Sequence, residues 1–468
     1  MKRIIYIGFS LLGGVLSAQN LTDGLRYSME GLNGTSRFNA MSGAFSSLGG
    51  DLSAVALNPA GTSIFTRSEM SVTLSGVNSK NDANGLTTIS SDFLLSQFGV
   101  AFPITIGEEG WKNIAFAFNY QKTHNFDAND LKYAYRSNGV NLGDYFSHFA
   151  NGISQQNLFL NDYYKNNRTG LWESKSQGGL SAIYSRMGGA PDPFRYRNAL
   201  LGYTTGLITP RNTGSEIKPN TPDNEANAIL NEKQYDRNFS NGTTTLQNVE
   251  RYTEGGVNKY NFNFAGRFDF LSFGINLNSH SVDYRVVTRY QENYSNNTTD
   301  IHSALYKEEV RTVGSGFSLQ LGAIAEVATG LRIGLTYASP TWYTLQDEMS
   351  QSLSANNGAT FANPNVVAVY EKYNFRTPGS WTVGASWVWN KQLILSADYM
   401  YRGYKYMRFT SDNQNSENAI IQNTLGDTNA LRFGAEYRLP LSKSNHLFLR
   451  GGYRYEQSPY KTELKPIG

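Results

Sequence analysis

Segments in which apolar and polar side chains alternate recur along the chain from residue 67 onward, and each is about ten residues long, the length of a strand that crosses a bilayer. The clearest is residues 380–389, whose apolar positions are Trp381, Val383, Ala385, Trp387 and Trp389. A period of two gives a strand one apolar face and one polar face. Residues 393–401 repeat the pattern after a turn at Asn390, so the two segments are predicted to form a hairpin.

Eleven segments follow this pattern, and a strand is predicted for each: 69–79, 91–102, 113–123, 258–267, 271–285, 311–327, 331–343, 373–389, 392–409, 429–438 and 446–457. Soluble sandwiches have shorter strands, of about 5 to 6 residues. Long strands that end in Trp and Tyr, joined by alternating short turns and long loops, are typical of membrane barrels. The sequence therefore predicts an all-β fold, a transmembrane antiparallel β-barrel.

The N-terminus has the pattern of a secretory signal peptide. Lys2 and Arg3 precede an apolar stretch at 4–16, which ends in the small residues Ser17 and Ala18. The stretch is too short for a transmembrane helix, which needs roughly 20 residues, and no longer apolar run follows. We therefore expect residues 1–18 to be a cleaved signal peptide and the mature chain to reach the outer membrane of a Gram-negative cell.

The barrel is predicted to occupy residues 67–468, with one long external loop at about 124–257. A loop of this length either carries function or is a disordered external loop, and the sequence favours neither. That loop is rich in Asn, Gly, Ser, Thr and Tyr, and short helices are predicted in it at 144–151 and 225–233. An odd number of strands does not close an ordinary bacterial barrel, and residues 465–468 have the composition of a loop. These two features predict a barrel that is truncated at its C-terminus.

Composition and motifs argue against several function classes. The chain has no Cys, which excludes disulfides and thiol chemistry, and its net charge of +3 is spread without a basic run, so no nucleic-acid partner is expected. There is no G-x-S-x-G nucleophile motif, and the five His residues are scattered at positions 124, 148, 280, 302 and 446. We therefore predict that the chain is not an enzyme and has no metal or other cofactor.

Residues 19–66 do not alternate, and they are rich in small side chains that allow a segment to thread a lumen. Asn58 and Pro59 form a turn signal within them. The stretch 37–61 resembles the N-terminal hatch of the FadL/TodX family of outer-membrane transporters, and Asn58, Pro59 and Ala60 match that family's Asn-Pro-Ala motif. The resemblance implies a barrel of 14 strands when complete, of which about 11 are present here, with residues 19–66 as a plug in its lumen.

The resemblance also implies a function: plug-gated, passive passage of small hydrophobic molecules, such as long-chain fatty acids, with lateral release into the membrane. Outer-membrane lipid and a hydrophobic ligand are then the expected partners, and a closed barrel without free edges is expected to be a monomer. The inward-facing Arg432, Arg438, Arg450 and Arg454 are candidate contacts for a ligand's charged head group, although such charges commonly form solvated networks. The alternatives are a haem-binding receptor and a structural or adhesive barrel without transport.

Overall fold

The structure is a computed structural model, and it describes residues 20–127, 130–214, 216–240, 242–411, 415–442 and 445–461. The predicted signal peptide, residues 1–18, and the chain end at 465–468 lie outside the described residues. Within the described ranges, no helix has both the length and the apolar character needed to cross a bilayer.

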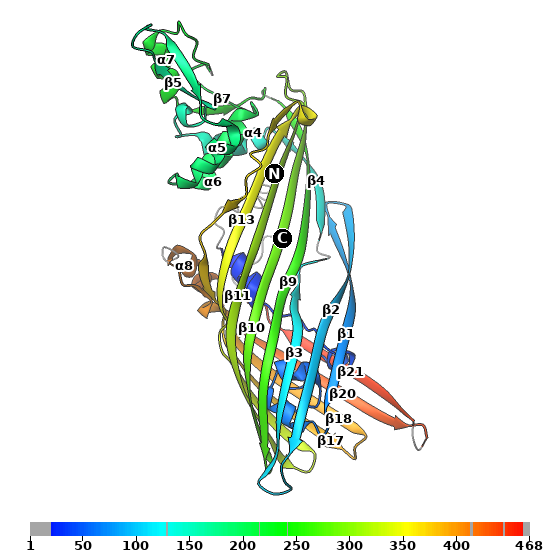
Figure 1. Cartoon of the computed structure of the whole chain (residues 1–468). Coiled ribbons are helices and arrows are strands. Elements are labelled where there is room, and N and C mark those ends of the chain that lie inside the picture. The colour runs from blue at the N-terminus through cyan, green and yellow to red at the C-terminus, as the bar shows by residue number, and fades with distance from the viewer. Residues whose placement is uncertain are drawn as a thin grey trace.

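One large antiparallel sheet dominates the molecule (Figure 1). Hydrogen bonds connect its long strands in the order β1 (Glu69–Ala83), β2 (Leu86–Thr105), β3 (Trp111–Asn125), β9 (Thr244–Phe268), β10 (Leu271–Ser295), β11 (Ser303–Ala328), β12 (Leu331–Ala338), β17 (Ser380–Trp389), β18 (Leu393–Gly403), β20 (Asp427–Pro440) and β21 (His446–Glu456). Beyond β12 the sheet continues through β13 (Trp342–Ala355), β14 (Thr360–Ala362), β15 (Ala368–Val369), β16 (Tyr373–Arg376) and β19 (Arg408–Phe409), and β4 (Leu131–Asn138) pairs with β9. Among the described residues, β1 and β21 are the two ends of this order.

Each of the eleven predicted strand segments lies in this sheet, but three of them are interrupted. The predicted segment 331–343 is divided between β12 and β13, and 373–389 is divided between β16 and β17. Pro340 and Pro378 lie in these two interruptions, where a residue without an N–H cannot continue the ladder. The third predicted segment, 392–409, is interrupted by the 3-10 helix η6 (Tyr404–Tyr406).

The two faces of the sheet differ as the alternation predicts. In β17, Trp387 is 44% exposed and the adjacent Ser386 is 2% exposed. Outward-facing Phe, Leu, Ile and Trp side chains form a band on the lower part of the strands, and one edge of the band is a cross-strand row of Tyr120, Tyr260, Phe317 and Trp342. A wall with apolar side chains outside and polar ones inside is the arrangement expected of a membrane barrel, so the predicted fold class is confirmed.

The N-terminal residues 20–65 lie on the inner face of this sheet (Figure 1). They form α2 (Leu21–Ser28), α3 (Ser36–Ala40) and the 3-10 helices η1 (Leu52–Ala56) and η2 (Pro59–Ile64). Leu52 packs near Gly99 of β2, whereas Met41 packs against Gly452 of β21. A short segment that touches both β2, the second strand of the order, and β21, its last strand, requires the sheet to curve around it.

The prediction that residues 124–257 form one long loop was wrong. The strand β4 and the first part of β9 extend the sheet into this range, and helices and short strands occupy much of the rest. Residues 139–243 form an insert at the far end of the long strands (Figure 1). It contains α4 (Leu142–Ala150), η3 (Gln155–Asn157), β5 (Asn161–Lys165), β6 (Trp172–Ser176), α5 (Gly179–Arg186), η4 (Met187–Gly189), α6 (Pro193–Thr204), β7 (Ile208–Pro210), α7 (Asp223–Asn231) and β8 (Tyr235–Arg237). Leu158, Leu200 and Leu201 are fully buried, so the insert has a packed core. Both predicted helices are present, as α4 and α7.

Candidate functional site

Asn58 holds together two turns of the N-terminal segment and the wall behind them. Its side-chain Oδ1 accepts the N–H of Ala60 at 3.0 Å and so caps the 3-10 helix η2, in which Pro59 is the first residue. Its Nδ2 donates to the carbonyl of Ser46 at 2.6 Å and to that of Ala323 in β11 at 3.3 Å. Asn58 is buried, and an amide at this point satisfies three backbone groups at once.

A row of glycines on the inner face makes room for this segment. A Cβ added to any of six of them would overlap or crowd its backbone or side chains: Gly274, Gly322, Gly334, Gly384, Gly434 and Gly452, one each in β10, β11, β12, β17, β20 and β21. Gly274 pairs directly with Gly322, Gly334 with Gly384, and Gly434 with Gly452. We call these six residues the glycine row. The wall is therefore shaped to the segment at residues 41–60, rather than merely enclosing it.

Polar side chains of the wall bind backbone carbonyls of the same segment. The amides of Asn276, Gln320 and Asn263 donate to the carbonyls of Val55, Leu57 and Pro59 at 2.7, 2.8 and 3.0 Å, and Arg332 donates to Leu48 at 3.0 Å. In β18, Asp398 accepts the backbone N–H of Ser46 at 3.0 Å. These bonds satisfy buried groups of a segment that has little regular structure of its own.

A cavity of about 100 Å³ lies between α2 and the following residues on one side and the wall on the other. Its lining includes the cationic side chains of Lys259, Arg402, Arg432 and Arg454 and the carboxylates of Glu30 and Glu456. Arg402 forms an ion pair with Glu30 at 3.5 Å and donates to the carbonyl of Ser28 at 3.2 Å. Burial opposes ionisation of Glu30, but Lys259 and Arg402 hold the pKa of Glu30 below its ordinary value. The cavity thus has more positive than negative charge.

The four predicted arginines do not meet at one point. Arg432 and Arg454 both line the cavity, and Arg432, which is 8% exposed, has no hydrogen-bond partner at its Nε among the described residues. Arg450 instead pairs with Glu436 at 2.6 Å, and Glu436 also binds Arg37 at 2.8 Å. Arg438 lies near the end of β20, where its backbone N–H donates to Gln392 at 2.7 Å, and it does not line the cavity.

Two cavity cations, Lys259 and Arg402, were not among the predicted site residues. Both lie at inward positions that the alternation already indicated, because Tyr260 and Tyr401 are their outward-facing neighbours. Their convergence on Glu30 depends on the path of the N-terminal segment, and no spacing in the sequence encodes it.

Above the cavity, α2 is surrounded by apolar and aromatic side chains. Leu25 and Tyr27 belong to a buried cluster that includes Val257, Val282, Tyr284, Tyr343, Leu345, Tyr373, Phe375, Met407 and Phe409. A Cβ at Gly24 would lie 2.7 Å from Cε of Met407, so the helix fills this space closely. The guanidinium of Arg26 lies 4.2 Å from the centre of the Tyr284 ring. We call this region the aromatic chamber.

Below the chamber the inner wall is polar. Side-chain amides form a ladder across four strands, in which Gln97 donates to Asn119 at 3.0 Å, Asn119 to Asn261 at 3.1 Å and Asn261 to Asn278 at 2.6 Å. These four strands therefore present polar side chains to the lumen beside the N-terminal segment.

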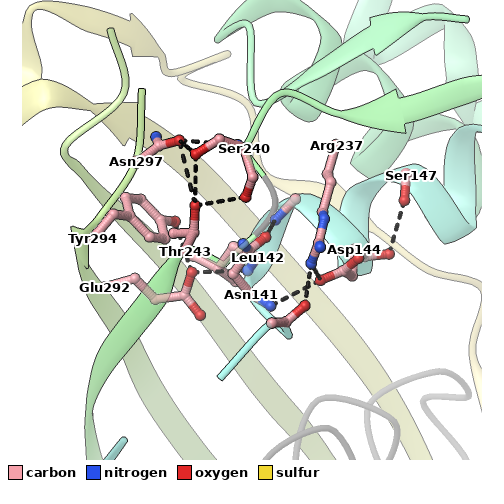
Figure 2. A network of polar contacts seen from close by, with 12 residues as sticks. Asn141, Leu142, Asp144, Ser147, Arg237, Ser240, Thr243, Glu292, Tyr294 and Asn297 are labelled. Carbon is pink, nitrogen blue, oxygen red and sulfur yellow. Dashed lines mark hydrogen bonds and ion pairs between the residues drawn. The ribbon is translucent and has the colours of Figure 1, made fainter. Parts of the chain in front are cut away.

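The insert is tied to the sheet by a polar network at its neck, shown in Figure 2. Glu292 of β10 accepts the backbone N–H of Leu142, at the start of α4, at 2.8 Å and the hydroxyl of Tyr294 at 2.6 Å, and Gln247 donates to it as well. Burial raises the pKa of Glu292 to about 7, against the effect of these hydrogen bonds. Glu292 lies far along β10 from the apolar band, which ends near Ser279, and so lies outside the membrane-spanning part.

Within the described ranges, no group of three His, Asp or Glu side chains is arranged to hold a metal ion. His280, which is buried next to the cavity, is within 2.9 Å of the hydroxyl of Ser318 and is therefore engaged by the wall.

Comparison with known proteins gives one family match. Residues 252–467 match the family model "Outer membrane protein transport protein (OMPP1/FadL/TodX)", which confirms the predicted resemblance to this family; the stretch 37–61, on which the prediction was made, lies outside the match. No curated protein shows a significant match in sequence. Similar solved structures include the Pseudomonas putida toluene transporter TodX (13% identity, 92% of this chain and 85% of that chain, TM-score 0.39) and a Pseudomonas aeruginosa FadL homologue (11% identity, 93% and 82%, TM-score 0.45).

Proposed function

We propose that this chain is an outer-membrane transport protein that admits small hydrophobic compounds through the aromatic chamber. The match of residues 252–467 to a family of outer-membrane transport proteins supports this class of function. The observation that carries the proposal is the aromatic chamber itself, a buried apolar region that is filled by one short helix, α2, and not by the wall. A ligand that displaces α2 would find apolar surface there.

An apolar ligand can compete with α2 for this surface because it can replace the apolar contacts that Leu25 and Tyr27 make there. Each CH₂ that leaves water gains about 0.8 kcal/mol, so a long acyl chain or an aromatic ring can compete with Leu25 and Tyr27 for the same surface. For a fatty acid, the cavity cations Lys259, Arg402, Arg432 and Arg454 are the groups that would bind the carboxylate. Of the other two predicted contacts, Arg450 pairs with Glu436, and Arg438 does not line the cavity.

We propose further that the ligand leaves sideways through the wall and not downward. The polar amide ladder and residues 41–60, which are packed closely against the wall, lie below the chamber. A ligand that continued downward would therefore place its apolar surface against polar groups. The strand interruptions at Pro340 and Pro378 lie side by side at the cavity, where Thr377 donates its N–H to the carbonyl of Thr341 at 3.0 Å. At this point two neighbouring strands lack a regular ladder, so the wall can open there more easily than along an uninterrupted pair such as β17–β18.

A double-cysteine variant tests this exit. The chain has no Cys, so Thr341→Cys with Thr377→Cys introduces a single cross-link across the two interruptions. Oxidation is expected to slow uptake of a labelled fatty acid into proteoliposomes at least tenfold, and reduction to restore it. The control pair is Ala385→Cys with Ala397→Cys, which are register partners in the uninterrupted β17–β18 pair. Equal uptake by the oxidised and reduced test variant would exclude this exit.

The function itself is tested with three labelled solutes in proteoliposomes: a long-chain fatty acid, toluene and a sugar. We expect uptake of one or both hydrophobic solutes and none of the sugar. Deleting residues 20–65 should increase ionic conductance in planar bilayers, because the segment fills the lumen. Uptake of sugar as fast as of the hydrophobic solutes, or the absence of any uptake, would contradict the proposal.

A further inference from the structure

A buried carboxyl group lies in the wall of the aromatic chamber, where it interacts electrostatically with side chains of α2. Asp347 of β13 is 2% exposed, and its Oδ1 accepts the hydroxyl of Thr312, its register partner on β11, at 2.5 Å. Its Oδ2 has no hydrogen-bond partner among the residues that the structure describes. A buried acceptor that is left unsatisfied is costly, so this oxygen requires an explanation.

A second unsatisfied group is its neighbour. Tyr373 of β16 is also 2% exposed, and within the described ranges its hydroxyl makes no hydrogen bond. Burial, and then the nearby carboxyl of Asp347, raise the pKa of this hydroxyl, yet the two groups are not aligned as a hydrogen-bonded pair. Tyr373 belongs to the aromatic chamber, so both groups lie where a ligand that displaces α2 would bind.

Arg26 of α2 interacts with Asp347 electrostatically but is engaged elsewhere. Its guanidinium pairs with Asp23 of the same helix and lies 4.2 Å from the centre of the Tyr284 ring. Asp347 lies beyond Trp342, where the apolar band ends on β13, and burial raises the pKa of Asp347 to about 7. The carboxyl is therefore partly uncharged at neutral pH, and it lacks a hydrogen-bond partner rather than a counter-ion.

We propose that Asp347 and Tyr373 form a polar subsite that binds the hydroxyl group of an otherwise hydrophobic ligand, an alcohol or a phenol. A hydroxyl both donates and accepts, so one such group can donate to Oδ2 of Asp347 and accept from the hydroxyl of Tyr373. A hydrocarbon would leave both wall groups unsatisfied, and an ammonium group has no lone pair for the tyrosine. The rest of the ligand lies against the apolar side chains of the chamber. The inference rests on the proposed function and names a class of ligand for it.

Ligand-observed NMR on the full chain in lipid nanodiscs, with the signal of empty nanodiscs subtracted, tests the subsite. The probes are 4-methylphenol and 1,4-dimethylbenzene, which have nearly the same shape and differ in one hydroxyl group. Thr312→Val with Asp347→Leu removes the carboxyl together with the hydroxyl that donates to it. The Kd of dimethylbenzene divided by that of methylphenol should fall about tenfold in this variant relative to the wild type. Tyr373→Phe should lower the same ratio less.

Met349→Leu is the matched control, because it changes the next inward side chain of β13 without removing a polar group. It should keep the wild-type ratio. Urea unfolding distinguishes a ligand subsite from a structural pair. We expect Thr312→Val with Asp347→Leu to be as stable as the wild type, because both partners of one hydrogen bond are replaced by apolar groups of similar shape.

The remaining outcomes separate the subsite from the chamber. A double variant that loses stability but keeps the binding ratio would overturn the proposal, because Asp347 and Tyr373 would then serve the fold. Binding of both probes with the same ratio in every variant would leave the chamber as a site for hydrophobic ligands and reject only the polar subsite. Binding of neither probe by the wild type would reject the subsite and the proposed function together.

Discussion

A Cβ at Gly452 of β21 would lie 2.6 Å from the carbonyl carbon of Met41 in the N-terminal segment. The residue before it, Gly451, points to the other side of the strand, and a Cβ there would meet nothing within 4 Å. Two adjacent glycines thus have different structural roles, because only one belongs to the glycine row.

Gly452→Val is expected to destabilise the contact between the N-terminal segment and the wall, because a backbone group that is held by bonds on several strands cannot move away. Overpacking of this kind typically costs about 1–3 kcal/mol. Gly451→Val is the matched control and should change little. Protease digestion of the refolded proteins measures the difference. We expect faster cleavage within residues 41–60 in the Gly452→Val variant than in the Gly451→Val variant. Equal cleavage of both variants would contradict the role of the glycine row.

Leu395→Arg should destabilise the barrel because Leu395 faces outward on the apolar band, where a charge cannot be hydrated. The expected cost is about 2–4 kcal/mol near the middle of the bilayer. Urea titration of the protein folded in lipid vesicles measures it, with Leu395→Met as the control for lost packing. A cost as small as that of the Met variant would mean that this face of β18 does not contact lipid.

Asn58→Ala removes three hydrogen bonds at one buried point and leaves the carbonyls of Ser46 and Ala323 without this donor. An unsatisfied buried group costs about 1–3 kcal/mol, so the N-terminal segment should leave its place more often. Planar-bilayer recordings should show more frequent openings to small ions than in the wild type. Ser42→Ala, in the same segment but at a less buried position, is the control. Identical recordings from Asn58→Ala and the wild type would show that Asn58 does not hold the segment.

The docking of the insert should weaken as pH rises from about 4.5 to about 7. Burial raises the pKa of Glu292 from its ordinary value of 4.5 to about 7, so in this window the docked state binds more protons than the undocked state. Protonated Glu292 therefore stabilises the docked insert. This stabilisation is fully present below pH 4.5, is lost by about pH 7 and totals about 3 kcal/mol. The urea midpoint for loss of the insert's helical circular dichroism measures it.

Glu292→Gln should remove this pH dependence, because the amide keeps the shape of the side chain and does not titrate. Glu225→Gln, an exposed change in α7, is the control and should retain it. A midpoint that depends on pH to the same extent in the wild type and in Glu292→Gln would assign the dependence to other groups.

Alternation alone located the strands and their faces. Trp387 points outward and Ser386 inward as their positions predict, since a period of two follows from the geometry of any extended strand. The turn signal at Asn58 and Pro59 was likewise local, because a side chain that caps its own turn needs no distant partner. The interruptions at Pro340 and Pro378 were not predicted, although proline marks both of them.

Tertiary structure decided which inward residues meet. Lys259 and Arg402 are far apart in sequence and come together at Glu30 only because the sheet curves around the N-terminal segment. The six residues of the glycine row are ordinary strand glycines until register places them at one level, facing one backbone. Local periodicity specifies the direction of a side chain relative to its own strand, whereas the partner it meets depends on strand order, register and curvature. Those arise from hydrogen bonds between segments that are distant in the sequence, which is why only the folded chain determined the site.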